Sequence, residues 1–276
     1  MTHPKISVII ATFNAEKTLQ RCLDSIFVQT YPNIELVVMD GQSHDDTIRI
    51  LTDHASKLAY WESSPDTGIY HAWNKALPHA TGDWICFLGA DDYFWENDSV
   101  ARIVPYLKAA ADSEIRAVYG KVSIVNPSGQ VIETMGRPWH KVKKLFLQEM
   151  CIPHPGLMHH RSLFEIHGKF DESFQVAGDY EFLLRELKES RALFASEVTV
   201  TSMTFGGVSS SSDSLDIVLR ETKRAQERND LRVLPWRWGW LHRFMLRKAL
   251  RRVLSNATLD AMRNLYRLAA RKGPIT

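Results

Sequence analysis

Several carboxylates in this sequence lie where a buried strand would end, and carboxylates in that position can bind a metal ion. Asp40 follows the apolar segment 34–39, and the adjacent Asp91 and Asp92 follow the apolar segment 84–88. In open α/β sheets, ligands bind just beyond the carboxyl ends of the parallel strands. Adjacent carboxylates suit a hard divalent cation such as Mg²⁺, which keeps several waters and binds substrate phosphates. The spacing therefore predicts a site for a cation and a diphosphate-bearing nucleotide at one edge of a sheet.

Three other polar residues fall at strand ends, namely Thr12 and Asn14 after the first apolar run and Asp66 after the third. Acidic groups gathered at one edge raise one another's pKa, so a positive charge must offset them. Taken alone, each Asp could instead be a turn or helix N-cap residue, because Asp favours both places. The chain has no GxGxxG and no GxxxxGK[ST] motif, which argues against a dinucleotide-binding dehydrogenase and a P-loop ATPase.

Alternating strand and helix patterns position these residues. Continuous apolar, β-branched runs are typical of strands buried on both faces of a parallel sheet. The expected strands are 6–11, 34–40, 58–63 and 83–89, and the expected helices are 14–29, 43–57 with Ser43 as N-cap, and 68–80. This order predicts βαβ units and an α/β fold with a mostly parallel central sheet flanked by helices.

The pattern changes after about residue 115. Two apolar segments around the turn "NPSG" predict a β-hairpin. Helices at 161–174 and 178–190, a strand at 192–203 and a helix at about 214–231 are expected to follow. We expect one domain over residues 1–212, with halves at about 1–115 and 116–212, and a C-terminal helical extension over residues 213–276.

The composition is that of an ordinary globular chain, with 276 residues, 45% hydrophobic and 24% charged. Cys22, Cys86 and Cys151 are odd in number and lack CxxC spacing, which argues against a disulfide framework or a zinc site and favours a reducing compartment. The apolar run near the N-terminus is too short for a signal peptide. No stretch approaches the roughly 18 apolar residues of a transmembrane helix. We therefore expect a cytoplasmic protein.

Residues 232–276 form a basic segment with 11 Lys/Arg and a single acidic residue, a net charge of +10 that leaves −8 for the rest of the chain. Trp236, Trp238 and Trp240 accompany the arginines, and the apolar residues recur at helical spacing. Basic, Trp-bearing amphipathic helices suit an anionic membrane surface. Two alternatives are a solvated basic face packed on the acidic body and a nucleic-acid-binding tail. The body has no nucleic-acid-binding motif, so we expect no nucleic acid partner.

Four segments together resemble family 2 glycosyltransferases, which are inverting enzymes with the GT-A fold. They are "VIIATFNAEKTLQRCLDSI", "ELVVMDGQSHDDT", "SPDTGIYHAWNKAL" and "GDWICFLGADD". The resemblance covers roughly residues 5–210 and is closest to bacterial members that build exopolysaccharide or lipopolysaccharide chains. It implies a nucleotide-sugar half at 1–115, an acceptor half at 116–212 and a divalent cation, Mg²⁺ or Mn²⁺.

The resemblance assigns expected roles to the donor residues. Thr12 and Asn14 would form the first nucleotide-binding loop. Asp40 would contact the uracil edge, and Asp66 would lie near the base and the diphosphate.

Two further pairs carry expected donor roles. In "ADD", Asp92 would ligate the cation that bridges the diphosphate, and Asp91 would lie near the ribose and the metal. Asn74 and Lys75 match the polar pair of "AMNKG"-like segments, although the sequence here is "AWNKA".

The catalytic base and the acceptor side come from the second half of the chain. An inverting transfer needs a carboxylate that deprotonates the acceptor hydroxyl. Asp179 in "VAGDYEFLLR" matches the family base, with a helix N-cap as the alternative reading and Glu181 as the next candidate base. His154 matches a position at the acceptor mouth, whereas His159 and His160 are expected to be structural or exposed.

These observations predict a metal-dependent, inverting glycosyltransferase of the hexosyltransferase type. It would use a nucleotide sugar, a UDP-sugar in the first instance, and a lipid-linked or growing surface-polysaccharide acceptor. We expect it to be peripheral on the inner face of a bacterial plasma membrane. The alternatives are a nucleotidyltransferase of similar α/β fold and a catalytically idle partner that binds sugar nucleotide or membrane in a synthesis complex.

Overall fold

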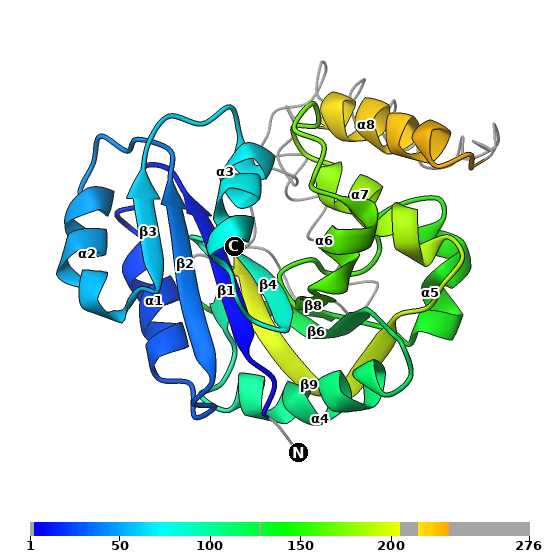
Figure 1. Ribbon diagram of the computed structural model, residues 1–276, viewed down its shortest axis with the longest axis horizontal. Helices are drawn as coiled ribbons and strands as arrows, with labels where there is room; N and C mark the ends of the chain where they lie inside the picture. The colour runs from blue at the N-terminus through cyan, green and yellow to red at the C-terminus, as the bar shows by residue number, and fades with distance from the viewer. Residues whose placement is uncertain (1–2, 127, 205–214, 232–276) are drawn as a thin grey trace, which may run out of the picture.

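A computed structural model describes residues 3–126, 128–204 and 215–231, and nine strands of this part of the chain form a single sheet (Figure 1). The strand order is β3-β2-β1-β4-β8-β6-β9-β5, with β7 paired to β6 outside that path. The basic segment 232–276 lies outside the described residues.

Four parallel strands form the N-terminal half of the sheet, and β1 lies between β2 and β4. They are β1 (Ile6–Thr12), β2 (Ile34–Asp40), β3 (Tyr60–Ser63) and β4 (Trp84–Gly89). Both faces of β1, β2 and β4 are buried, which is why these strands are continuous apolar runs in the sequence. The predicted strand positions are therefore confirmed to within about two residues, the usual uncertainty of an element boundary.

The remaining strands have mixed directions. Strand β8 runs antiparallel to both β4 and β6, β6 runs parallel to β9, and β5 runs antiparallel to β9. The hairpin predicted around "NPSG" is present as β6 and β7. The bounds are β5 (Tyr93–Phe94), β6 (Ala117–Val125), β7 (Val131–Met135), β8 (Leu157–His160) and β9 (Leu193–Thr204).

Helices cover both faces of the sheet. Because side chains alternate along a strand, Ile9 of β1 packs into one core with α3, α5 and α7, whereas Val8 and Ile10 pack into a second core with α1, α2 and α4. The bounds are α1 (Leu19–Phe27), α2 (Thr47–Asp53), η1 (Ala55–Lys57), α3 (Ile69–Ala76), η2 (Leu77–His79), α4 (Ser99–Ala111), α5 (Trp139–Phe146), α6 (Ser162–His167), α7 (Gly178–Leu187) and α8 (Leu215–Arg228).

The structure corrects one local expectation and excludes one alternative reading. Helix α2 begins at Thr47 rather than beside Ser43, because the Ser43 hydroxyl donates instead to the buried Asp40 carboxylate, at 2.5 Å. Asp92 is not a helix cap, because strand β5 follows it directly.

Helix α8 is the described part of the predicted extension, and it lies along α7 (Figure 1). Its Ala225 is fully buried in the core that contains α7. The side-chain amide of Gln226 donates a hydrogen bond to the Gln148 carbonyl at 2.7 Å, which joins α8 to the segment after α5. Helix α8 is therefore packed on the second half of the domain.

Candidate active site

The carboxyl ends of β1, β2, β3 and β4 lie at one edge of the sheet. Thr12 is paired with Asp40, and Asp40 in turn is paired with Ser63 on β3. On the other side of β1, Ala11 is paired with Gly89, the residue that ends β4. The structure thus brings the predicted strand-end residues to a common edge.

Asp40 is 1% exposed, and both of its carboxylate oxygens accept hydrogen bonds. The Ser43 hydroxyl donates to Oδ1, while the Ser43 N–H, at 2.8 Å, and the Ser63 hydroxyl, at 2.7 Å, donate to Oδ2. Charge-assisted hydrogen bonds of this kind hold a buried carboxylate in a fixed position. Asp40 therefore presents a rigid acceptor group at the end of β2.

The loop after β1 is fixed to the loop after β2. The Asn14 N–H donates to the Ser43 hydroxyl at 2.8 Å, and the Asn14 side-chain oxygen accepts from the His44 N–H at 2.9 Å. Asn14 has a φ of 49°, a left-handed conformation that Asn tolerates better than most residues. At the same edge, the buried Thr12 hydroxyl lacks a hydrogen-bond partner within the described residues.

Asp66 lies over the backbone of Gly41, just beyond β2. A Cβ atom added to Gly41 would be 2.7 Å from Oδ2 of Asp66, so the close approach requires glycine. Oδ1 of Asp66 accepts the Gly68 N–H at 3.0 Å, immediately before α3 begins. Asp66 is therefore placed between the end of β2 and the start of α3.

The two carboxylates of Asp91 and Asp92 converge over Gly89. A Cβ atom on Gly89 would be 2.8 Å from Oδ1 of Asp91 and 3.0 Å from Oδ2 of Asp92. Asp92 is 6% exposed, and its other oxygen accepts the Thr204 N–H at 3.2 Å. Burial, and secondarily the Asp91 charge, raise the pKa of Asp92 well above its usual range. Such a carboxylate is stabilised in its charged form when a cation binds beside it.

This pair fits a divalent cation that keeps water or substrate oxygens as its other ligands. One oxygen from each carboxylate lies close to the backbone of Gly89, so both carboxylates are on the same side of this residue. Within the described residues, no group of three or more His, Cys, Asp or Glu side chains could hold a metal ion unaided. The donor set thus suits an ion that is shared with a ligand, with Asp92 and Asp91 as the protein's contribution.

Arg21 of α1 supplies positive charge next to this pair, and the sequence reasoning did not find it. Its guanidinium donates to the backbone carbonyl of Asp91 at 3.1 Å and to the Thr204 hydroxyl at 3.2 Å, and it lies 4.4 Å from the Tyr93 ring centroid. The sequence places Arg21 in the first predicted helix but does not indicate what it contacts, because its partner Thr204 is 183 residues away.

Asn74 and Lys75, the other two predicted donor residues, make contacts within the protein. Asn74 is 4% exposed, and its amide exchanges hydrogen bonds with the backbone of Phe170, at 2.9 and 3.0 Å, and donates to Glu172 at 2.8 Å. Lys75 forms an ion pair with Glu62 at 3.0 Å and donates to Ser64. The structure places Asn74 at the contact between α3 and the segment after α6, apart from the strand-end group.

Asp179, the predicted base, lies in the first turn of α7 and is partly exposed. Its Oδ1 accepts the Tyr180 N–H at 2.8 Å and lies 3.3 Å from the Tyr70 hydroxyl. Burial, and secondarily the Asp179 charge, raise the pKa of Tyr70 well above its usual range, so the phenol stays a hydrogen-bond donor. Tyr70 belongs to α3, which begins at Ile69, three residues after Asp66. Helix α3 therefore connects the donor edge to Asp179.

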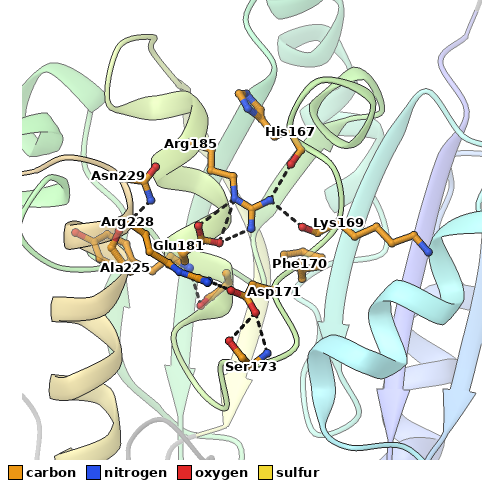
Figure 2. Close-up of polar contacts among 12 residues, drawn as sticks. His167, Lys169, Phe170, Asp171, Ser173, Glu181, Arg185, Ala225, Arg228 and Asn229 are labelled. Carbon is orange, nitrogen blue, oxygen red and sulfur yellow. Dashed lines mark hydrogen bonds and ion pairs between the residues drawn. The ribbon is translucent and has the colours of Figure 1, made fainter.

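Glu181, the second candidate base, is held in an internal ion pair. It is 4% exposed, and both of its oxygens accept hydrogen bonds from the Arg185 guanidinium (Figure 2). Arg185 also donates to the backbone carbonyls of His167 and Lys169, each at 2.8 Å. This arrangement joins α7 to the end of α6, and it favours Asp179 over Glu181 as the carboxylate that a substrate can reach.

His154 packs against two neighbouring aromatic rings, those of Trp73 and Phe87. Its ring centroid is 5.2 Å from that of Trp73 and 5.9 Å from that of Phe87. Burial lowers the pKa of His154, whereas the negative charge of Asp179 acts in the opposite direction. His159 is fully buried behind it and bonds to the Ile85 carbonyl at 3.3 Å, as expected of a structural residue.

The chain belongs to glycosyl transferase family 2, because residues 7–165 match the sequence profile of that family. A glycosyltransferase from Mycobacterium bovis, named for PGL/p-HBAD biosynthesis, is 32% identical over 214 residues, which are 76% of this chain and 80% of the relative. An uncharacterized glycosyltransferase of Mycobacterium tuberculosis is 33% identical over 183 residues, or 66% of this chain and 68% of the relative. The protein is thus a glycosyltransferase.

Solved structures with the same fold agree with this family. Residues 1–349 of Staphylococcus aureus TarS, in complex with UDP-GlcNAc, align with a TM-score of 0.61 at 21% identity over 83% of this chain and 68% of that one. The mannosyltransferase PcManGT from Pyrobaculum calidifontis, in complex with GDP-Man and Mn²⁺, aligns with a TM-score of 0.55 at 26% identity over 73% of this chain and 57% of that one. The predicted GT-A fold is confirmed.

The relatives support the predicted family but not the predicted type of biosynthesis. The Mycobacterium bovis relative carries a name from PGL/p-HBAD biosynthesis rather than from exopolysaccharide or lipopolysaccharide synthesis. That finer assignment stays a prediction. In the described part of the chain, no helix has both the length and the apolar character needed to cross a bilayer.

Proposed function

We propose that this protein is a metal-dependent, inverting glycosyltransferase that moves a hexosyl group from a nucleotide diphosphate to an acceptor hydroxyl. The observation that carries the proposal is the pair of carboxylates beside Gly89 at the end of β4, together with a separate, partly exposed carboxylate at Asp179. Membership of glycosyl transferase family 2 argues against the alternative that the protein is a nucleotidyltransferase.

The donor nucleotide would bind across the ends of β1, β2 and β4. Asp40, fixed by Ser43 and Ser63, would accept hydrogen bonds from the base, and Thr12 Oγ1 would gain the partner that it lacks within the described residues. Asp91 and Asp92 would hold a divalent cation, which when bound neutralises the diphosphate as it leaves. A UDP-sugar is the donor we propose first, and the UDP-GlcNAc and GDP-Man complexes of the two structural neighbours support a sugar nucleotide.

Asp179 would act as the general base. Its carboxylate would accept the proton of the acceptor hydroxyl while the hydroxyl oxygen bonds to the anomeric carbon. The bond from that carbon to the diphosphate oxygen would break on the opposite side, so the configuration inverts. The Tyr180 N–H, together with the Tyr70 hydroxyl whose single hydrogen is shared with the Val176 carbonyl, would hold Oδ1 of Asp179 in place, which leaves Oδ2 for the acceptor. His154 would line the same side.

We further propose that the acceptor is a lipid-linked or growing surface polysaccharide and that the enzyme works at the inner face of the plasma membrane. The net charge of +10 over residues 232–276, together with three tryptophans, supports contact with an anionic membrane surface. That segment and its predicted helices lie outside the described residues. No nucleic acid partner is proposed.

The test is a nucleotide-release assay with a panel of UDP-sugars and GDP-mannose, run on the wild type and on Asp179→Asn. The account expects release with a UDP-sugar and a fall in kcat of about 10²- to 10⁴-fold in Asp179→Asn, the usual contribution of general base catalysis. Release with GDP-mannose alone would replace the donor assignment. Full activity of Asp179→Asn would remove the base assignment, and no release with any donor would favour an idle partner.

A further inference from the structure

The three residues before α7, the helix that carries Asp179, are held by a residue from another helix. The N-cap residue of α7 is Ala177, whose methyl side chain cannot accept a hydrogen bond. The carboxylate of Glu221, in the middle of α8, accepts three successive backbone N–H groups instead. Oε1 accepts from Gln175 at 2.7 Å, and Oε2 accepts from Val176 at 2.8 Å and from Ala177 at 2.9 Å.

This contact satisfies backbone donors at and just before the start of α7. Only the Ala177 N–H belongs to the first N–H groups of the helix, which lack partners within it, and a negative charge near that end is favourable. Glu221 is 8% exposed, so little water competes for these donors. Charge-assisted hydrogen bonds are shorter and stronger than neutral ones. The Glu221 carboxylate therefore fixes the backbone path of residues 175–177.

The same short segment is held from its other side by Tyr70. The Tyr70 hydroxyl donates to the Val176 carbonyl at 2.7 Å and also reaches Oδ1 of Asp179. The Tyr70 ring lies so close to Gly178 that a Cβ atom there would be 2.8 Å from it. The chain that leads into Asp179 is thus clamped between the carboxylate of Glu221 and the phenol of Tyr70.

Helix α8 has attachments of its own that do not involve Glu221. Arg228 forms an ion pair with Asp171, which in turn accepts hydrogen bonds from Ser173 (Figure 2). The Arg224 guanidinium lies 3.7 Å from the centroid of the Phe174 ring. These contacts and that of Gln226 hold α8 against the rest of the protein. We therefore expect that removal of the Glu221 charge weakens its contact with residues 175–177 and leaves α8 in place.

We propose that Glu221 is a positioning residue for the catalytic base: it holds the N-terminus of α7 so that the Asp179 carboxylate meets the acceptor hydroxyl. This proposal rests on the proposed role of Asp179. It assigns to α8 a part in the transfer reaction that goes beyond packing. A misplacement of a reacting group by about 1 Å can cost about 10²-fold in rate, so even a small shift of this turn is measurable.

The test compares Glu221→Gln with two controls on the same helix. Glutamine keeps the size but has one acceptor oxygen, and its NH₂ group faces N–H donors. Glu227→Gln makes the same chemical change at an exposed carboxylate whose described ion pair is with Lys223 on the helix surface. Gln226→Ala removes buried hydrogen bonds of α8 to the segment after α5 and to the Tyr180 hydroxyl, and leaves the contacts of Glu221 with residues 175–177 intact. Glu221→Asp keeps the charge on a shorter side chain.

Four quantities are measured for each variant: kcat and donor KM in the transfer assay, the thermal midpoint, and hydrogen–deuterium exchange of the peptide that contains residues 174–179. For Glu221→Gln the proposal predicts a kcat about 10- to 100-fold lower, a donor KM within about twofold of the wild type, and faster exchange of that peptide. Glu221→Asp should recover part of kcat. Glu227→Gln should match the wild type, and Gln226→Ala should lose stability with kcat kept.

Two results would overturn the proposal while Asp179→Asn remains inactive. One is wild-type kcat in Glu221→Gln despite faster exchange at residues 174–179. The other is an equal fall in kcat for Gln226→Ala at the same loss of thermal midpoint, which would assign the effect to stability. Wild-type kcat in Asp179→Asn would instead remove the base assignment, and with it the role of Glu221, so the two failures are distinguishable.

Discussion

The Tyr70 hydroxyl contacts the Val176 carbonyl and the Asp179 carboxylate. We expect the first contact to affect stability and the second to affect catalysis. We predict that Tyr70→Phe lowers kcat by about tenfold, because the ring still packs against Gly178 but the carboxylate loses a fixed partner. The thermal midpoint should also fall, since a buried carbonyl left unpaired costs about 1–3 kcal/mol. Steady-state kinetics and thermal unfolding measure the two effects.

Tyr180→Phe is the matched control for that variant. The Tyr180 hydroxyl donates to the Phe146 carbonyl at 2.8 Å, so the substitution removes a buried hydrogen bond of the same kind without touching the Asp179 carboxylate. Its thermal midpoint should fall by a similar amount while kcat stays near the wild-type value. Equal kinetic losses in both variants would argue against a specific role for the Tyr70 hydroxyl.

Both carboxylates of the proposed metal site, Asp91 and Asp92, lie close to Gly89. We predict that Gly89→Ala weakens cation-dependent UDP binding by at least about tenfold, because the new methyl group would lie 2.8 Å from Oδ1 of Asp91 and 3.0 Å from Oδ2 of Asp92. Titration of UDP in the presence of Mn²⁺ measures the effect. Binding equal to that of the wild type would mean that the cation lies elsewhere.

At the scale of the elements, Glu35 of β2 joins the opposite, amino-terminal edge of the parallel strands to the loop before β4. Its carboxylate accepts hydrogen bonds from the Ser7 hydroxyl, at 2.5 Å, and from the backbone N–H and hydroxyl of Thr81, and it pairs with Lys5 at 2.6 Å. Burial acts to raise the pKa of Glu35, but the hydrogen bonds from Lys5, Ser7 and Thr81 prevail and lower it to about 2.

A pKa below that of the unfolded chain gives Glu35 a defined effect on stability. Its contribution is fully present above the ordinary pKa of 4.5 and is lost as the pH falls toward 2. We predict that Glu35→Gln lowers the free energy of unfolding at pH 7 by about 2 kcal/mol, and that the difference from the wild type narrows as the pH falls from 4.5 to 2. Urea unfolding at a series of pH values measures this. A gap that stays constant with pH would contradict it.

The central strands were predictable because a strand that is buried on both faces is a continuous apolar run in the sequence, as in β1 and β4. Strand-end residues such as Asp40 and Asp92 followed from the topology. Strand β8 was missed because it spans four residues and ends in His159 and His160, which pair with β4 rather than with a sequence neighbour. Helices α4 and α5 were also missed.

The contacts around the site were less predictable, since most of them join distant parts of the chain. Asn74 was expected beside the donor, but its partners Phe170 and Glu172 are 96 and 98 residues away, and no local pattern encodes them. The partnership of Glu221 with residues 175–177 is of the same type. Sequence patterns give the edge of the sheet, whereas the clamp around Asp179 depends on the packing of α3, α7 and α8.

At the scale of the whole molecule, the acidic body and the basic segment 232–276 are expected to meet different partners. We predict that a chain truncated after residue 231 loses sedimentation with vesicles that contain anionic lipid, and keeps its kcat toward a water-soluble acceptor. The intact chain should bind such vesicles, and more weakly at high salt because screening shortens the reach of the charges. Equal sedimentation of both chains would contradict a membrane role for this segment.

The central claim is that Asp91 and Asp92 build a cation-dependent nucleotide site at the end of β4. Calorimetric titration of UDP into the intact protein, with and without Mn²⁺ or Mg²⁺, tests it most directly when repeated on Asp92→Ala. The account predicts binding by the wild type that needs the cation and is lost in Asp92→Ala, with the thermal midpoint retained. UDP binding that is the same without a cation, or the same in Asp92→Ala, would contradict the account.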